Sequence, residues 1–265
     1  MRAKRNLANL GSHLPEGRIV GILLPTDPNT VPLPVVMAII PALLLHSWQS
    51  VSEYWGLTSE SSAAWQKTLV DLYQTADRHY HTLGHVQDLL CHRQMLVERK
   101  IPIMTELMDT VIWFHDAIYN PTSQSNETES AALFGRFLED CSLRDKNKED
   151  YVMLLIIHTQ HHTDELPSFI LDSPTFEQDA QLFLDLDLSI LGAEPMKYEV
   201  YAKNIRKEYS HVADDLYRRG RSGVLRTFLH SPALYRTAVG LKLWQKQAEH
   251  NIAKELQMLD DDVSQ

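Results

Sequence analysis

The sequence predicts an all-α protein with one helical domain. From His46 onward, apolar residues recur at helical spacing in almost every segment, whereas the alternation typical of β-strands is rare. No heptad pattern persists, so the helices are expected to pack into a globular bundle rather than a coiled coil. With 265 residues, of which 44% are hydrophobic, the chain can bury one large core. We therefore expect a helical domain over residues 46–260.

The first 45 residues have a different composition. Glycines and a row of prolines from Pro15 to Pro41 interrupt every periodic pattern, which favours an irregular extension over residues 1–45. No Asp, Glu, Lys or Arg occurs between Asp27 and Glu53. The strictly apolar part is nevertheless shorter than the ~20 residues that a membrane span needs, and it contains prolines. No membrane contact is expected.

The predicted helices begin at cap residues and end at turn residues. A serine-rich segment opens the helix at Ser59, and Asn120-Pro121 should end the helix that starts at Ile103. Gly220 and Ser231-Pro232 mark short breaks in the last third. Helices are predicted over residues 59–73, 82–97, 103–119, 126–138, 148–162, 175–191, 197–218, 224–229 and 232–243, the last continuing to 258.

The net charge and the cysteine content limit the functions that the sequence favours. The net charge of −10 indicates no surface for nucleic acid or anionic membranes, so a phosphorylated substrate would need local positive charge or a metal. Cys91 and Cys141 fit no zinc-site spacing and are typical of reduced thiols in a cytoplasmic protein. Nothing in the sequence indicates the oligomeric state.

His115 and Asp116 are the first candidate metal ligands. The apolar stripe of Met104, Met108 and Ile112 continues into His115, so this histidine should point inward. A buried carboxylate beside a buried imidazole needs a compensating charge, which a divalent cation supplies. The alternative is a satisfied core histidine beside a surface aspartate that caps the helix end.

Three further clusters place histidine or aspartate on apolar faces. His81 and His85 are four residues apart and therefore share a helical face. An apolar stripe beginning at Tyr151 runs into three histidines, His158, His161 and His162, which could equally form a hydrated helix end. Asp187 has apolar neighbours at helical spacing, so we expect it to be more buried than Asp185 and the better ligand.

The order of these residues resembles the HD superfamily of metal-dependent phosphohydrolases, which is defined by a His, a His-Asp pair and a distant Asp on a helical bundle. The motifs RHYHTLGH from Arg78, FHDAIYNP from Phe114, NETESA from Asn126 and LDLDLSILG from Leu184 look like one bacterial-type branch of predicted phosphohydrolases. The resemblance covers roughly residues 46–245, including the segment Ile205–Tyr209 and Gly220-Arg221.

The resemblance implies a role for each candidate residue. The metal ligands would be His85, His115, Asp116 and Asp187, holding a divalent cation such as Mn, Mg, Co, Ni or Fe. His81 would be the general acid, by similarity to the HisxxxHis spacing of cyclic-nucleotide phosphodiesterases, and Asp116 would orient the attacking water. The candidate phosphate-binding residues are Arg78, Arg206 and Arg221, and candidates for a second metal or for substrate are His158, His161, His162 and Glu129.

The expected function is hydrolysis of a small phosphoester, such as a nucleotide, by a metal-activated water. Cyclic-nucleotide hydrolysis is not implied, because those enzymes carry a further histidine shortly after the His-Asp pair and residues 117–120 supply none. Two alternatives remain open. One is a di-iron HD-type oxygenase that uses the additional histidines, and the other is a non-catalytic, metal-stabilised module that binds a nucleotide or a partner.

Overall fold

The described part of the chain is entirely helical. A computed structural model describes residues 33–231 and 234–261, with side chains from residue 42 to 260 in these ranges, and no strand occurs among them. The α-helices are α1 (Leu33–Tyr54), α2 (Ser59–Tyr73), α3 (Leu83–Glu98), α4 (Thr105–Phe114), α5 (Asn126–Glu139), α6 (Lys146–His158), α7 (Ser168–Leu171), α8 (Pro174–Asp187), α9 (Pro195–Glu208), α10 (Asp214–His230), α11 (Ala238–Gly240) and α12 (Lys246–Asp261). Short helical turns η1 (Thr159–His161), η2 (Leu188–Gly192) and η3 (Leu241–Gln245) join some of them.

The prediction of an all-α fold is confirmed for these residues, but the irregular extension is shorter than predicted. Contacts divide the chain into a unit ending at Ile39 and a unit beginning at Ile40, and the second unit is described below. Residues 33–45 are helical, and Pro34 is tolerated in the first turn because the amide that proline lacks has no helical partner there. Residues 1–32 of the predicted extension lie outside the described residues. None of the described helices is long and apolar enough to cross a membrane.

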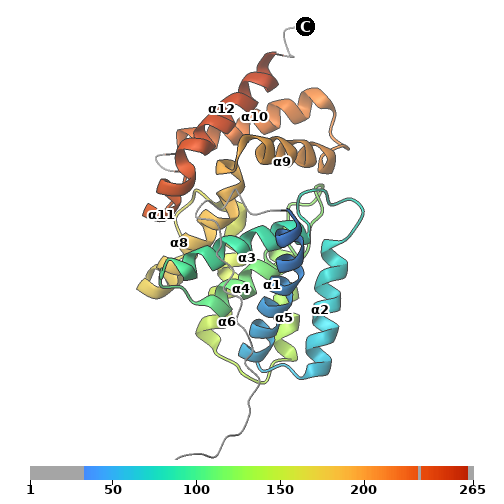
Figure 1. Cartoon of the computed structure of the whole chain (residues 1–265), viewed down its shortest axis with the longest axis vertical. Coiled ribbons are helices and arrows are strands. Elements are labelled where there is room, and N and C mark those ends of the chain that lie inside the picture. Colours follow the sequence, from blue (N-terminus) through green and yellow to red (C-terminus); the bar gives the residue numbers. More distant parts are fainter. Residues whose placement is uncertain (1–32, 232–233, 262–265) are drawn as a thin grey trace, which may run out of the picture. The chain divides into compact units, whose positions relative to one another are not determined.

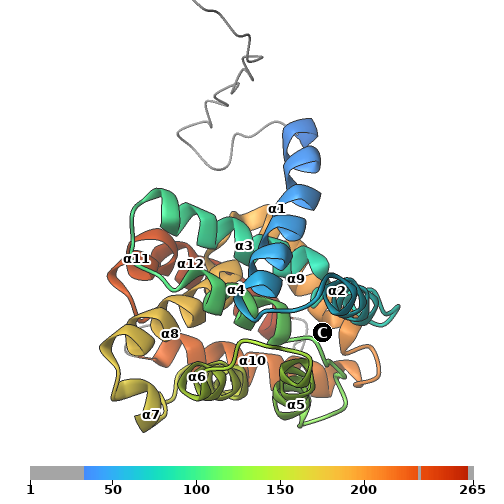
Figure 2. The ribbon, with the colours of Figure 1, turned by 90° about the horizontal axis from the view of Figure 1, so that it is seen from below.

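Helix α4 lies in the middle of the bundle (Figures 1 and 2) and contacts α3, α5 and α6. All eight residues from Leu107 to Phe114 are buried, including Met108 and Ile112 of the predicted apolar stripe. The indole of Trp113 donates to Oγ of Ser47 on α1 (3.1 Å), and that of Trp55 donates to Thr110 (2.9 Å). Helix α1 is therefore part of the core around α4.

A buried ion pair fixes α3 against α4. Nε and Nη2 of Arg93 donate to the two carboxylate oxygens of Asp109 at 2.6 and 2.7 Å, and both side chains are almost fully buried. A two-bonded Arg–Asp pair holds one relative orientation of its partners. Since α3 carries His85 and α4 leads into His115, this pair sets how the two histidines face each other.

Several predicted helix boundaries differ from the structure. The helix predicted over 103–119 ends at Phe114, and Arg78 donates to the carbonyl of Ala117 in the turn that follows (2.7 Å). The helix predicted over 197–218 ends at Glu208, and α10 runs unbroken through Gly220. Nη1 of Arg206 donates to the carbonyl of Tyr209 (2.8 Å), which stabilises the end of α9.

Helices α9, α10 and α12 lie together at one end of the unit (Figure 1), and α9 and α12 both contact η2 at the end of α8. Asn251 on α12 donates to the carbonyls of Leu191 and Ala193 at 2.9 and 2.8 Å. These contacts position the C-terminal helices beside the residues that follow Asp187.

Candidate metal centre

Two histidines from different helices meet in the core. His85 lies in the first turn of α3, where Thr82 caps the helix by accepting from the amide of Gly84 (3.2 Å). His115 is the residue that ends α4, and its side chain is 1% exposed. The Nε2 atoms of the two rings lie 3.2 Å apart. The prediction that His115 points inward is confirmed.

The far nitrogen of each ring is held by a hydrogen bond. Nδ1 of His115 lies 3.0 Å from the carbonyl oxygen of Ile112, which can only accept, so Nδ1 carries the hydrogen. Nδ1 of His85 lies 3.1 Å from Oη of Tyr80. Such bonds fix ring orientation and tautomer in metal sites, and they leave Nε2 of both rings free for a cation.

Two carboxylates complete the cluster. Oδ2 of Asp116 lies 3.1 Å from Nε2 of His115 and 3.6 Å from Nε2 of His85. Oδ1 of Asp187 lies 3.0 Å from Nε2 of His85 and 3.5 Å from Nε2 of His115. Among the described residues, His85, His115 and Asp116 form a metal-capable group. Each offers one ligand atom, and these atoms all lie within 4.8 Å of one another.

These spacings fit a metal ion. Ligand atoms about 2.0–2.2 Å from a first-row divalent cation or Mg²⁺, at tetrahedral or octahedral angles, are about 2.9–3.5 Å apart. The mixture of two imidazoles and two carboxylates suits Mn, Fe, Co, Ni or Zn better than Ca, which prefers oxygen ligands alone. His85, His115 and Asp116 therefore fit the cation that the sequence predicts, and Asp187 lies beside both histidines.

The electrostatics favour positive charge at the same place. Burial opposes protonation of His115, but the carboxylates of Asp116 and Asp187 outweigh it and hold the pKa of His115 well above its ordinary value. Burial likewise opposes ionisation of Asp187, yet His115, His162 and His85 hold the pKa of that carboxyl well below its usual range. A site that favours a proton on an imidazole this strongly also attracts a divalent cation.

The two aspartates of the LDLD segment have separate surroundings. Asp187 lies beside the histidines, whereas Asp185 accepts from the backbone amides of Arg236 (2.6 Å) and Thr237 (2.9 Å) and from the Thr237 hydroxyl (2.6 Å). The prediction that Asp187 is the more buried of the two is wrong. Its side chain is 12% exposed, while Asp185 is 1% exposed, because Asp185 is enclosed by the segment it caps.

His81 is held at the edge of the cluster by a residue that the sequence analysis did not single out. Nδ1 of His81 lies 2.8 Å from Oε2 of Glu208, and Oε1 of Glu208 accepts from the amides of three consecutive residues, His79, Tyr80 and His81, at 2.7, 2.6 and 3.0 Å. The ring of Tyr119 stacks on His81 with centroids 4.1 Å apart, and its hydroxyl donates to Glu208. His81 precedes α3 rather than lying on the same helix as His85.

Glu208 carries a recognisable signal. It continues the inward stripe of Tyr198, Tyr201 and Ile205 on α9, and all four residues are buried. An acid at the end of an apolar stripe needs a partner, which is the same reasoning that selected Asp187.

The three arginines predicted to bind phosphate have protein partners. Arg78 donates to the carbonyls of His81, Asp116 and Ala117 at 3.0, 2.6 and 2.7 Å. Arg206 donates to the carbonyls of Tyr209 and Val212 and stacks over Tyr217. Arg221 pairs with both oxygens of Glu255 at 2.8 and 3.1 Å, and of the three it alone lines the cavity beside the cluster.

The candidates for a second metal are mostly apart from the cluster. Nε2 of His162 lies 2.7 Å from Oδ2 of Asp187, so His162 joins the site. The side chain of His161 is 60% exposed and faces Asp164. His158 is buried, does not line the cavity, and has a pKa that burial and Arg236 lower to about 4. Glu129 is exposed and accepts from Ser125 (2.5 Å), while its neighbour Glu127 lines the cavity.

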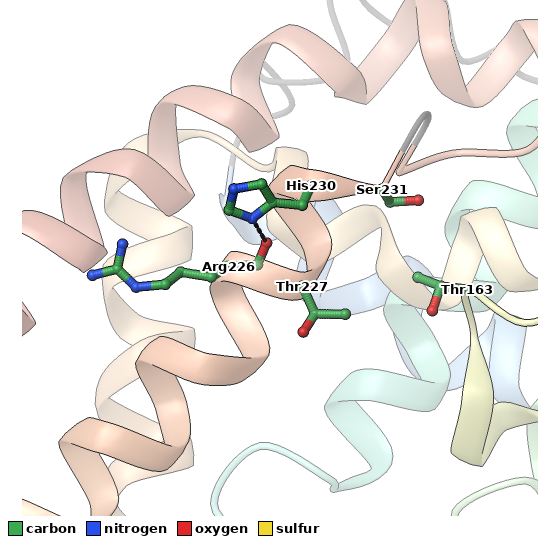
Figure 3. A pocket seen from close by; sticks show the side chains of 5 residues that line it. All are labelled: Thr163, Arg226, Thr227, His230 and Ser231. Atoms are coloured by element: carbon green, nitrogen blue, oxygen red, sulfur yellow. Dashed lines mark hydrogen bonds between the residues drawn. The ribbon is translucent and has the colours of Figure 1, made fainter.

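A cavity of about 710 Å³ opens over the cluster. His81, His85, Asp116, His162 and Asp187 line one part of it. A second cavity of about 490 Å³, shown in Figure 3, is lined by Thr163, Arg226, Thr227, His230 and Ser231. Arg226 and Thr163 lie at opposite sides of that view, and none of the predicted site residues lines this second cavity.

Comparison of the whole chain with protein-family models, with curated proteins and with solved structures finds no match. The class of the site is therefore defined by its own geometry. It is a group of two buried histidines and two partly exposed carboxylates, beside a histidine held by a glutamate, at one cavity of a helical bundle.

Proposed function

We propose that the protein is a metal-dependent phosphoester hydrolase of the HD type. The observation that carries the proposal is a ligand set of His85, His115, Asp116 and Asp187 beside a separate histidine that a carboxylate orients. His85, Asp116 and Asp187 line one cavity together with that histidine, His81. A metal centre and an independent acid are the two components that hydrolysis of an unactivated phosphoester requires.

A divalent cation bound by these four residues would lower the pKa of a water molecule and withdraw charge from the phosphoryl group. The carboxylate of Asp116 orients the attacking water and accepts its proton as the new P–O bond forms. The imidazolium of His81 gives the proton on Nε2 to the leaving alcohol oxygen as the old P–O bond breaks. Glu208 keeps Nδ1 of His81 occupied, so that Nε2 is the nitrogen that acts.

The charge state of His81 supports this role. Burial lowers the pKa of its imidazole, but Asp116 and Glu208 together outweigh burial and raise that pKa above its ordinary value. The protonated form of His81, which a general acid needs, is therefore favoured over that of a free imidazole.

The di-iron alternative has less support. It requires additional histidines around a second metal, and of the three candidates His162 alone contacts the cluster. We therefore do not propose dioxygen chemistry.

The test is phosphate release from a panel of nucleotides and phosphomonoesters with Mg, Mn, Co, Ni or Fe, together with metal analysis. The proposal is supported if the protein hydrolyses a substrate of the panel and if His85→Asn and His115→Asn each abolish both hydrolysis and metal binding. His92→Asn is a matched control, because His92 lies on α3 like His85 but faces Ser189 (2.9 Å) and does not line the cavity. Bound metal with no turnover indicates a binding module, and tightly bound iron with dioxygen uptake indicates the oxygenase.

A further inference from the structure

The cavity over the metal centre has two chemically different sides. The polar side carries the cluster and His81. The other side comes from η2, α9, α10 and the segment between α9 and α10, and consists mainly of tyrosines and aliphatic side chains, among them Tyr201, Tyr209, Leu216, Tyr217 and Val224. We call this side the α9–α10 wall. Hydrolysis of a phosphoester bond at the cluster does not by itself require such a wall.

Helix α10 exposes apolar side chains to the cavity. Leu216 is 55% exposed and Val224 is 49% exposed, although both line the cavity. They lie four residues before and after Gly220, so the three positions share one helical face. Side chains that contribute little to the core yet gather at a cavity are typical of a ligand-binding surface.

Gly220 leaves open space in this wall. A Cβ atom built at Gly220 would meet no atom outside its own stretch of helix within 4 Å, whereas one at Gly192 or Gly240 would clash at 2.5 or 2.3 Å. Gly220 lines the cavity and Gly223, which is equally unobstructed, does not. The space beside Gly220 therefore belongs to the cavity rather than to the packing of the helices.

The cavity carries little positive charge for phosphate. Of the described residues that line it, Asp116, Glu127 and Asp187 are acids, none is lysine and Arg221 is the one arginine. Glu255 already neutralises Arg221 through two hydrogen bonds. Apart from a divalent cation at the cluster, the cavity therefore offers little positive charge for a chain of phosphates.

We propose that the substrate is a phosphomonoester whose alcohol part carries an aromatic ring system, and that this ring packs against the α9–α10 wall. The proposal rests on the proposed phosphohydrolase function and adds its substrate class. Tyr201, Tyr209 and Tyr217 line the cavity and offer aromatic edges that can pack against another ring. One face of Tyr201 and one of Tyr217 are already covered by Arg221 and Arg206, so the contact we propose is with the ring parts that reach the cavity. Leu216, Gly220 and Val224 form the adjoining apolar surface.

The test compares substrates that differ in one group. Adenosine 5′-monophosphate and ribose 5-phosphate have the same reacting phosphate and differ in the ring, while adenosine 5′-triphosphate adds two phosphates. The proposal expects kcat/KM for the monophosphate to exceed both of the others by at least ~10-fold. The other nucleoside monophosphates and naphthyl phosphate extend the panel. If no ring-bearing monophosphate exceeds its ring-free counterpart, the proposal is wrong.

Two variants of α10 test the position of the ring. Gly220→Leu fills the open space and is expected to lower affinity for the ring-bearing monophosphate at least ~10-fold, while Gly223→Leu on the same helix should leave it unchanged. Both changes replace a helical glycine, so both should preserve or raise helix stability. An equal effect of the two variants contradicts the proposal.

A binding measurement separates this inference from the proposed function. Adenosine, which has no phosphate, is followed by equilibrium dialysis with the metal-free and the metal-loaded protein. If adenosine binds and Gly220→Leu weakens that binding, the result supports the α9–α10 wall. This holds even if no phosphate is released from any substrate, a result that would contradict only the proposed hydrolase function. Phosphate release without binding of adenosine or of any other ring-bearing alcohol in the panel would leave the hydrolase standing and overturn the wall.

Discussion

Glu208 holds His81 through both of its carboxylate oxygens. Oε2 pairs with Nδ1 of the imidazole at 2.8 Å, and Oε1 accepts from the backbone amide of the same residue at 3.0 Å. Burial alone would raise the pKa of Glu208, but the bonds from His81 and from the Tyr80 amide lower it to about 2. Glu208 is therefore ionised, and it fixes the position of the candidate acid and favours its protonated form.

We expect Glu208→Gln to move the alkaline limb of the pH–rate profile to lower pH. Glutamine still accepts from the amides of residues 79–81, but it removes the charge that raises the pKa of His81. Because His81 must be protonated to act, activity would be lost at a lower pH, and turnover should fall about 10-fold, less than the ~10²–10⁴-fold of a complete general acid. Tyr119→Phe, which removes one hydrogen bond to Glu208, is the control and should change the profile little. An unmoved limb in Glu208→Gln would show that His81 is not the acid.

Variants of His81 and of His85 should differ in the amount of metal that they bind. His81→Asn is expected to keep the metal while lowering turnover ~10²–10⁴-fold, and the loss should shrink for nitrophenyl phosphate, whose leaving group needs little protonation. His85→Asn should lose the metal, and no leaving group should restore activity. The exposed neighbour His79→Asn serves as the control. Metal loss in His81→Asn would make His81 a ligand.

Asp185→Asn and Asp187→Asn should fail in different ways. Asp187→Asn is expected to lose the metal, because its Oδ1 faces both histidines. Asp185→Asn should keep the metal but lower the free energy of unfolding by about 1–3 kcal/mol, since it weakens the capping of Arg236 and Thr237. Metal analysis and urea unfolding measure the two effects. Metal loss confined to the Asp185 variant would reverse the assignment.

Asp179 should make stability depend on pH in an unusual direction. Burial raises its pKa to about 6, although the Met104 amide and the Tyr151 hydroxyl donate to its two oxygens. Since the folded pKa lies above the unfolded value, this residue contributes less stability as pH rises from about 4 to 6, by up to about 3 kcal/mol. Asp179→Asn should therefore gain stability relative to the natural chain over that window and keep the gain above it. Urea unfolding at several pH values would show this, and a difference that does not vary with pH would contradict it.

The N-terminal residues should be dispensable up to the start of the buried face of α1. A chain that begins at Leu43 is expected to fold and bind metal, because it retains Trp48, Val51 and Trp55, which are at most 1% exposed. A chain that begins at Gly56 loses all three and should not fold, since removing one buried tryptophan side chain already costs about 3–5 kcal/mol. Circular dichroism and metal content compare the two. Failure of the first chain would show that residues before 43 belong to the core.

Helix boundaries could be predicted from the sequence where residues next to the boundary determine them. The helix over 59–73 was predicted at its observed limits because Thr58 and the serines after it supply a cap that any neighbouring structure would leave intact. The ends of α4 and α9 could not be predicted in the same way, because Arg78 and Arg206 bind carbonyls there through contacts that exist after folding. Gly220 looked like a break, but a glycine is tolerated inside a long helix at a cost of about 1 kcal/mol.

The candidate site could also be predicted only in part. The inward stripes were sufficient to select His85, His115 and Asp187, because a polar residue at the end of a buried face needs partners there. A similar inward stripe on α9 ends at Glu208, but its link to His81 could not be seen in the sequence because the two residues are 127 positions apart. Exposure could not be inferred for His161 or Glu129, since η1 interrupts the helical period after His158 and Glu129 turns toward its own helix cap.

The contacts of Arg78 have a consequence for how this site tolerates change. The guanidinium binds the chain at positions 81, 116 and 117 through main-chain carbonyls. Main-chain anchoring does not depend on which side chains those positions carry, so the loop before α3 and the turn after α4 keep their relative placement when His81 or Asp116 is replaced. Substitutions at positions 81 and 116 can therefore change the chemistry of the site while the loop and the turn keep their relative placement. A substitution of Arg78 would remove the contacts that hold both segments.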